Sequence, residues 1–294
     1  MIGANGGKDG ALLTVEDLSV RFHTRTGIVD AVRNISFSVG REKVGIVGES
    51  GSGKTMTGRS VLRLIRPPGE ITAKRMEFDG HDLLTLSEKQ MRDIRGDRIS
   101  MVMQDPKYSL NPVMTIGEQI AEAYRVHTGA SFRDAKARAA EMLAAVKIRD
   151  PERVLSLYPH EVSGGMGQRI MIAMMLIPDP DLMIADEPTS ALDVTVQMQV
   201  LAIIDDLVTQ RGMGLMFVSH DLNLVASFCD RVIIMYAGQI VETCKASELD
   251  QAKHPYTRGL LNSLPRLDRE PGPLPVLERQ ESWKTEPGVD AYFK

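Results

Sequence analysis

The spacing of hydrophobic and polar positions changes several times along the chain, and each change predicts a different element. Apolar and polar residues alternate over 12–20 and 29–39, on either side of a turn near 24–27, which predicts an antiparallel hairpin. The mostly apolar run at 43–47 predicts a short buried strand, and we expect a helix over 57–65. Later in this half of the chain we expect strands at 74–78 and 98–103 and a helix at 87–94.

Residues 105–160 have a different texture, because prolines separate short helical patterns and strand signals are missing. Ser131 followed by Asp134 has the form of a helix-capping box. Apolar residues then recur at helical spacing, at positions 135, 139, 142, 143 and 146. The pattern predicts an α-helical subdomain at about 105–165, inserted into an α/β core.

The α/β pattern returns at Leu182 and predicts a mainly parallel sheet with helices on both faces. The strands are expected at 182–185, 215–218, 231–235 and 239–243, and the helices at 194–210 and 221–228. Two short helices are predicted at 246–249 and 255–264. Residues 266–294 are rich in proline and charge, so we expect them to form a flexible tail.

The composition narrows the class of protein. The chain of 294 residues has a formal net charge of −4, which does not indicate a nucleic-acid binder. Cys229 and Cys244 are in no metal-like spacing, so we expect them to pack as small apolar residues in a reducing cytoplasm rather than to form a disulfide. The glycine-rich start is unlike a signal peptide, and the apolar stretches are too short to span a membrane. Any work at a membrane would therefore depend on a partner.

A glycine-rich stretch between the predicted strand at 43–47 and the helix after it carries the most specific chemistry. It reads Gly48-Glu49-Ser50-Gly51-Ser52-Gly53-Lys54-Thr55, which fits the phosphate-binding P-loop pattern G-x-x-x-x-G-K-[ST]. Glycines let the backbone turn tightly so that its N–H groups and the following helix N-terminus face an anion. Lys54 would contact the β- and γ-phosphates and the Thr55 hydroxyl would bind Mg²⁺. The alternative is an ordinary glycine-rich turn, which the flanking strand and helix disfavour.

A pair of carboxylates follows the predicted strand at 182–185. Asp186 and Glu187 stand at its carboxyl end, where α/β folds place their ligands. We expect Asp186 to serve the Mg²⁺ shell and Glu187 to orient or deprotonate the attacking water. The alternative is an acidic turn at a strand end without a function, which the presence of a P-loop upstream disfavours.

The order of the remaining motifs resembles that of the ATP-binding cassette (ABC) ATPases. Val162-Ser163-Gly164-Gly165-Met166 is similar to the family's signature motif, usually written Leu-Ser-Gly-Gly-Gln. Gln104 matches the Q-loop glutamine, Ser190-Ala191-Leu192-Asp193 the D-loop, and His220 the switch histidine. Phe22 stands where the family has its adenine-stacking aromatic, although a half-buried strand aromatic is an equally good interpretation of that residue.

The resemblance covers about residues 12–265 and implies an α/β fold. The implied fold consists of a P-loop NTPase (RecA-like) core, an N-terminal antiparallel β subdomain and the inserted helical subdomain. It also implies two cofactors, ATP and Mg²⁺, with Thr55, Gln104 and Asp186 as the metal-side residues. Glu187, His220 and Gln104 are the implied catalytic residues. Ser163, Gly164 and Gly165 would contact the γ-phosphate of ATP bound to a partner ATPase.

Four features resemble the branch of this family that imports peptides and nickel. They are Met166 in place of the usual glutamine, Asn111-Pro112 after the Q-loop, Ala191-Leu192-Asp193-Val194-Thr195, and His254-Pro255-Tyr256-Thr257-Arg258. This branch implies a related second ATPase subunit, two membrane-spanning permease subunits and, indirectly, an extracytoplasmic substrate-binding protein, with no nucleic acid. The location implied is peripheral, at the cytoplasmic face of the inner membrane. We hypothesise that Tyr108 contacts a permease.

The expected function is therefore ATP hydrolysis coupled to uptake of short peptides. The same ATPase motifs serve importers of nickel chelates and of opines or sugars, so these cargoes remain open. A soluble, non-transport ABC ATPase is disfavoured because the chain has one P-loop and no heptad run. A regulatory subunit that does not hydrolyse ATP is disfavoured because Lys54, Asp186, Glu187 and His220 are all present. Residues 265–294 contain no cysteine, so we expect no iron–sulfur cluster there.

Overall fold

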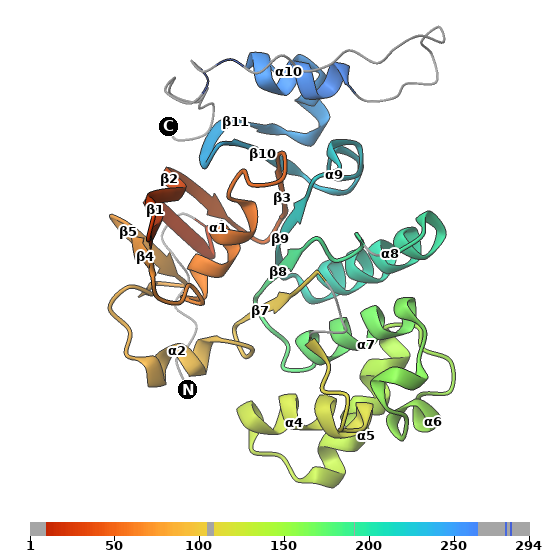
Figure 1. Ribbon diagram of the computed structural model, residues 1–294. Coiled ribbons are helices and arrows are strands. Elements are labelled where there is room, and N and C mark those ends of the chain that lie inside the picture. The colour runs from red at the N-terminus through yellow and green to blue at the C-terminus, as the bar shows by residue number, and fades with distance from the viewer. Residues whose placement is uncertain (1–9, 105–108, 191, 264–279, 281–282, 284–294) are drawn as a thin grey trace, which may run out of the picture. The chain divides into compact units, whose positions relative to one another are not determined.

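The computed structural model of the protein describes residues 10–104, 109–190, 192–263, 280 and 283 (Figure 1). They fall into two compact units. Among the described residues, the first unit comprises 86–215, and the second comprises 10–85 and the residues from 216 onward. The chain passes from the first unit to the second within strand β9 (Gly214–Ser219).

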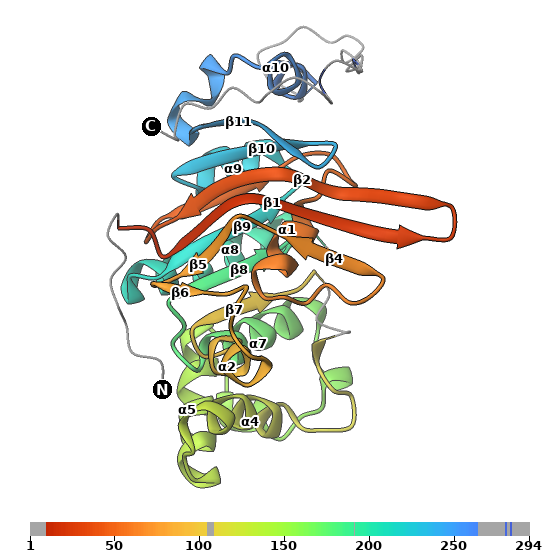
Figure 2. The ribbon, with the colours of Figure 1, turned by 90° about the vertical axis from the view of Figure 1, so that its left-hand side faces the viewer.

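The second unit begins with an antiparallel sheet built on a long hairpin, which Figure 2 shows from the side. Strands β1 (Leu13–Thr24) and β2 (Gly27–Val39) pair antiparallel, so the predicted hairpin is confirmed, with longer strands than expected. Strand β5 (Arg75–Phe78) pairs with β1 and with β6 (His81–Asp82). The short strand β4 (Gly69–Thr72), which the sequence pattern did not predict, also pairs with β1.

The second unit also contains the strand that leads into the glycine-rich loop, together with its neighbours in the sheet. Strand β3 (Lys43–Val47) pairs in parallel with β10 (Arg231–Tyr236), which pairs antiparallel with β11 (Gln239–Lys245). Within this unit the strand order is β11-β10-β3-β9. The interior residues of β3 and β10 are buried, which fits their nearly unbroken apolar sequences.

The helix after the glycine-rich loop has different bounds from those predicted. Helix α1 spans Lys54–Val61, whereas the sequence pattern predicted 57–65. It starts earlier because the loop closes at Gly53, which is its N-cap. It ends earlier because Arg63 has a positive φ of 51°, which a continuing right-handed helix excludes.

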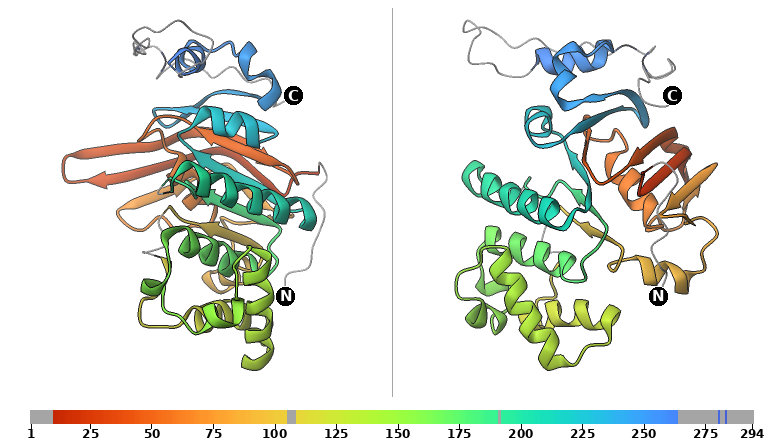
Figure 3. Two further views of the ribbon diagram at one scale, coloured as in Figure 1. Left: turned by 90° about the vertical axis from the view of Figure 1, so that its right-hand side faces the viewer. Right: turned by 180° about the vertical axis from the view of Figure 1, so that it is seen from behind.

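The first unit is mostly helical. Its helices are α2 (Glu88–Ile94), α4 (Ile116–Thr128), α5 (Phe132–Ala145), α6 (Pro151–Leu155), α7 (Gly164–Leu176) and α8 (Val194–Arg211), with a short 3₁₀ helix at Pro159–Glu161. Helices α4 to α7 pack against one another, in yellow-green to green in Figure 3. Ser131 caps α5 as predicted, and the apolar positions predicted at helical spacing in this helix are all buried.

A pair of parallel strands accompanies these helices in the first unit. Strand β7 (Ile99–Val102) lies beside β8 (Leu182–Asp186), with Val102 opposite Ala185. All of the residues in both strands are buried, as their apolar sequences predict. The carboxyl ends of the two strands therefore lie at one edge of the pair.

The last elements of the second unit are helix α9 (Leu222–Phe228), a 3₁₀ helix at Ala246–Gln251 and helix α10 (Pro255–Asn262). Of the predicted tail at 266–294, only residues 280 and 283 are described, and Trp283 is buried. Both cysteines are free thiols. Among the described residues, no helix is both long enough and apolar enough to span a membrane.

Candidate functional site

The glycine-rich loop joins β3 to α1 in the second unit, as the sequence predicted. At Gly53 the backbone has a φ of 100°, a conformation that side chains other than glycine rarely adopt. A Cβ added to Gly48 would lie 2.1 Å from the carbonyl oxygen of Met235 in β10, so only glycine fits there. Gly48 is thus required by close packing and Gly53 by its backbone conformation.

Lys54 is held by the loop that precedes it. Its side chain is 5% exposed, and Nζ donates to the carbonyl oxygens of Gly48 at 2.7 Å and Glu49 at 2.8 Å. It also reaches the Ser52 hydroxyl at 3.4 Å. A buried ammonium needs such acceptors to offset the loss of water. The charge is therefore fixed at the loop before any anion arrives.

The backbone N–H of Glu49 is bound from a distant part of the second unit. It donates to the hydroxyl of Tyr256 in α10, at 3.2 Å. In the sequence, Tyr256 belongs to a motif typical of one branch of the resembled family. No sequence signal connected it with the loop, because more than two hundred positions separate the two residues.

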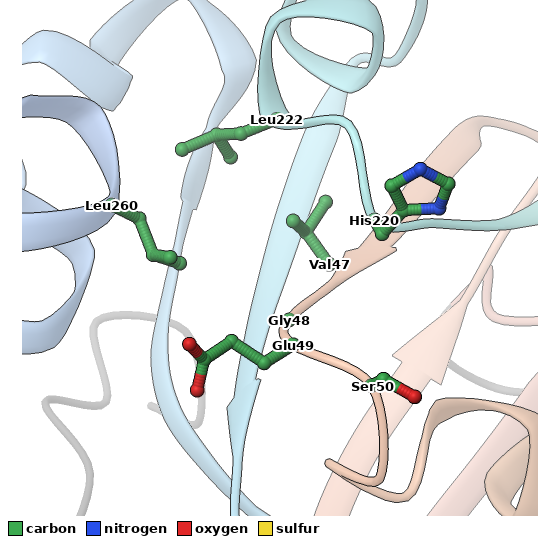
Figure 4. Close-up of a pocket in the computed structure, with 7 residues that line it drawn as sticks. All are labelled: Val47, Gly48, Glu49, Ser50, His220, Leu222 and Leu260. Carbon is green, nitrogen blue, oxygen red and sulfur yellow. The ribbon is translucent and has the colours of Figure 1, made fainter. Parts of the chain in front are cut away.

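A cavity of about 400 Å³ opens beside the loop in the second unit. It is lined by Val47, Gly48, Glu49, Ser50, His220, Leu222 and Leu260 (Figure 4). His220 follows β9 and is exposed. The structure thus brings four of the predicted site residues, Gly48, Glu49, Ser50 and His220, to one cavity. The lining thus combines residues of the loop with one histidine and three aliphatic residues.

The first unit presents the two predicted carboxylates. Asp186 is the last residue of β8 and is 4% exposed, whereas Glu187 is half-buried. Gln104 Nε2 donates to Glu187 Oε2 at 3.5 Å. This contact follows from the parallel register, because Gln104 and Glu187 each lie two residues beyond the Val102–Ala185 pair.

Glu187 has an unusual backbone conformation. Its φ is 48°, which costs a residue with a side chain about 1–2 kcal/mol. Its carbonyl oxygen accepts hydrogen bonds from the backbone N–H and the hydroxyl of Ser190, both within 3.3 Å. These bonds stabilise the turn in which Glu187 lies.

The predicted signature residues lie at the start of α7 in the first unit. Ser163 is the N-cap, and its hydroxyl accepts a hydrogen bond from the N–H of Met166 at 3.4 Å. A Cβ on Gly164 would meet open space, but one on Gly165 would lie 2.6 Å from Val196 Cγ1 in α8. Gly165 is therefore needed for helix packing inside the first unit, a role that the sequence motif did not predict.

Two further predicted site residues, Phe22 and Thr55, lie on β1 and α1. Phe22 is half-buried in β1, opposite Val29 of β2 and Gly69 of β4. Thr55 is in the first turn of α1. Tyr108 and Ala191, which were predicted to belong to the Q-loop region and the D-loop, lie outside the described residues.

Comparisons with known proteins give one consistent family. The family described as ABC transporter matches residues 32–190. The chain is 49% identical over 277 residues to the probable peptide ABC transporter ATP-binding protein y4tR of Sinorhizobium fredii, covering 90% of this chain and 83% of that protein. It is 46% identical over 274 residues to the dipeptide transport ATP-binding protein DppD of Escherichia coli, covering 90% of this chain and 84% of that protein.

A solved structure agrees with the sequence comparisons. The chain superimposes on the ATP-binding cassette MJ0796, solved as a dimer in a post-hydrolysis state with ADP and phosphate, with a TM-score of 0.71 and 26% identity. The match covers 80% of this chain and 98% of that one. The predicted fold class is therefore confirmed.

Proposed function

Because the chain belongs to the ABC transporter family, we propose that it is the ATP-hydrolysing subunit of an importer of short peptides. The protein is an ATPase that binds ATP. The observation that carries the proposal is the loop with its buried Lys54, in a chain whose relatives over 90% of its length are peptide transport ATP-binding proteins. The peptide cargo is carried over from those relatives.

The loop supplies the phosphate-binding part of the reaction. In this proposal the N-terminus of α1 and the loop N–H groups, apart from that of Glu49, which is bonded to Tyr256, would face the phosphates, and Lys54 would neutralise charge on the β- and γ-phosphates. His220 shares a cavity with residues 48–50, which supports a role for its imidazole next to the γ-phosphate. Phe22 is proposed to stack on the adenine.

Thr55, Gln104 and Asp186 are proposed to hold Mg²⁺. They fit this hard cation because they offer a hydroxyl, an amide oxygen and a carboxylate. The Gln104 amide nitrogen donates to Glu187, which leaves its carbonyl oxygen for a cation, and Asp186 is a buried carboxylate at a strand end. When bound, the metal would neutralise charge that develops on the phosphate oxygens.

Glu187 is proposed to orient or deprotonate the attacking water. The Gln104 contact and the turn held by Ser190 both support a defined direction for its carboxylate. Ser163, Gly164 and Gly165 are proposed to act on ATP bound to a second ATPase subunit. Ser163 and Gly164 are exposed at a helix N-terminus, which supports an anion-binding role across such a dimer.

The assembly we propose contains a related second ATPase, two permease subunits and, indirectly, an extracytoplasmic binding protein. It places this chain peripherally at the cytoplasmic face of the inner membrane. We further propose that residues 12–265 form the ABC ATPase domain, that 105–165 form its helical subdomain, and that 266–294 are a flexible tail.

The test is ATP hydrolysis by the full complex in liposomes, with and without binding protein loaded with short peptides. We expect peptides to stimulate hydrolysis, and we expect the stimulation to disappear in Glu187→Gln. Stimulation by nickel chelates or opines instead would keep the ATPase and overturn the peptide cargo. Undiminished hydrolysis in Glu187→Gln would overturn the role of that residue.

A further inference from the structure

One peptide group of the glycine-rich loop is held at both of its polar ends. The carbonyl oxygen of Gly48 accepts from Lys54 Nζ at 2.7 Å, and the N–H of the same peptide, on Glu49, donates to the Tyr256 hydroxyl at 3.2 Å. In a trans peptide the C=O and N–H point in opposite directions. Two bonds at opposite ends therefore prevent this peptide plane from rotating.

Tyr256 is well placed to act as a fixed point. Its side chain is fully buried, and its ring packs on Tyr236 and Trp283, with centroid distances of 4.6 Å and 5.9 Å. Its backbone N–H donates to Nδ1 of His254 at 3.1 Å. A hydroxyl on a ring held in this way cannot follow the loop if the loop moves.

A buried carboxylate holds the turn that precedes Tyr256. Glu242 in β11 is 4% exposed and accepts hydrogen bonds from the backbone N–H groups of Lys253 at 2.6 Å and His254 at 3.3 Å. The start of α10 is thus joined to β11, which pairs with β10 and, through β10, is joined to the loop-bearing strand β3. The backbone just before Tyr256 is therefore held in place by the sheet, through Glu242.

We propose that Tyr256 is a positioning residue for Lys54. Its hydroxyl fixes the Gly48–Glu49 peptide, and that peptide fixes the ammonium that binds the phosphates of ATP. The inference rests on the proposed use of this loop for ATP. Without the hydroxyl, the peptide can turn, and part of the binding free energy of ATP is then needed to order Lys54 again.

The test compares Tyr256→Phe with Tyr236→Phe in the full-length chain. Both variants keep a ring in the same aromatic cluster, but only the first removes the hydroxyl bound to Glu49. Equilibrium titration with MgATP, the KM and kcat of hydrolysis in the complex, and the melting temperature are measured for both. We expect Tyr256→Phe to weaken ATP binding and to raise KM by roughly five- to tenfold, with kcat changed less than twofold. Tyr236→Phe should leave ATP affinity within twofold.

A double variant tests whether Tyr256 acts through Lys54. Once Lys54 is replaced by alanine the hydroxyl has no ammonium to position, so adding Tyr256→Phe should change the remaining affinity less than twofold. An equal loss in both backgrounds would overturn the proposal. So would a Tyr256→Phe variant with a lowered melting temperature and unchanged ATP affinity. A wild-type chain that does not bind ATP would refute the use of the loop for ATP, which is a different failure.

Discussion

The glycine-rich loop of the second unit and the acidic strand end of the first unit are built in opposite ways. Lys54 is buried, with carbonyl acceptors at 2.7 Å and 2.8 Å, whereas Glu187 is half-buried and its contact with Gln104 is 3.5 Å long. A group that binds a ligand gains from being ordered in advance. A group that activates water must stay accessible, and such contacts often tighten only in the reacting complex. This difference agrees with the roles we propose, ATP binding for the loop and chemistry for the strand end.

The largest effect is expected from Glu187→Gln, which should separate chemistry from binding. Loss of a base in the transition state should lower kcat by roughly 10³-fold, while ATP affinity stays within twofold because the loop is intact. Single-turnover hydrolysis and equilibrium binding on the same preparation measure the two quantities. A large loss of ATP affinity would contradict the division of roles between the two regions.

The opposite result is expected from Lys54→Ala. Removing a charged donor to the phosphates should weaken ATP binding by roughly 10- to 100-fold. The fold should persist, because α1 is also joined to the loop by backbone hydrogen bonds such as Thr57 N–H to Gly53 at 2.9 Å. Titration with MgATP and a thermal melt test this. Normal binding in this variant would refute the function of the loop.

The signature glycines offer a matched pair within the first unit. Gly165→Ala brings a Cβ to 2.6 Å from Val196 and should lower the free energy of unfolding by about 1–3 kcal/mol. Gly164→Ala faces open space and should change it by about 0.5 kcal/mol or less. Urea unfolding of both variants is the measurement. Equal destabilisation would mean that the packing of α7 on α8 does not distinguish the two positions.

The smallest effect concerns a thiol of the second unit that lies close to the loop-bearing strand. A Cβ on Gly45 of β3 would lie 3.1 Å from Cys229 Sγ. Burial raises the pKa of Cys229 to about 12, so almost no thiolate exists at neutral pH and alkylation of the folded protein should be slow. Cys244, whose pKa burial raises to about 11, is the internal control for the alkylation experiment.

The same shift has a consequence for stability. As the pH rises past 9, the unfolded chain loses its Cys229 proton while the folded protein keeps it until about pH 12. The free energy of unfolding should therefore fall across this window. Mass spectrometry after timed alkylation, with urea melts at pH 8 and 10, checks both statements. Rapid labelling of Cys229 at pH 8 would mean that the packing of Cys229 next to Gly45 of β3 opens readily.

Local sequence patterns predicted most elements, because burial and spacing are properties of neighbouring residues. The hairpin, the loop-bearing strand and the apolar face of α5 are examples. Strand β4 was missed because it exists through pairing with β1 rather than through its own pattern. The contact between Gln104 and Glu187 depends on the register of β7 and β8, which no local pattern reveals. Tyr256 was noticed as a motif, but its bond to Glu49 depends on the tertiary fold.

Trp283 gives the protein a built-in optical probe. It is the one tryptophan in the sequence, and it is buried against Tyr236, His254 and Tyr256. Intrinsic tryptophan emission therefore reports on a single place, the ring cluster next to the glycine-rich loop. A shift in emission during unfolding marks the departure of Trp283 from that cluster, whereas circular dichroism follows the helices of both units, the longest of which lie in the first unit. The difference between the unfolding midpoints from emission and from circular dichroism would measure how independently the ring cluster around Trp283 unfolds from the helices.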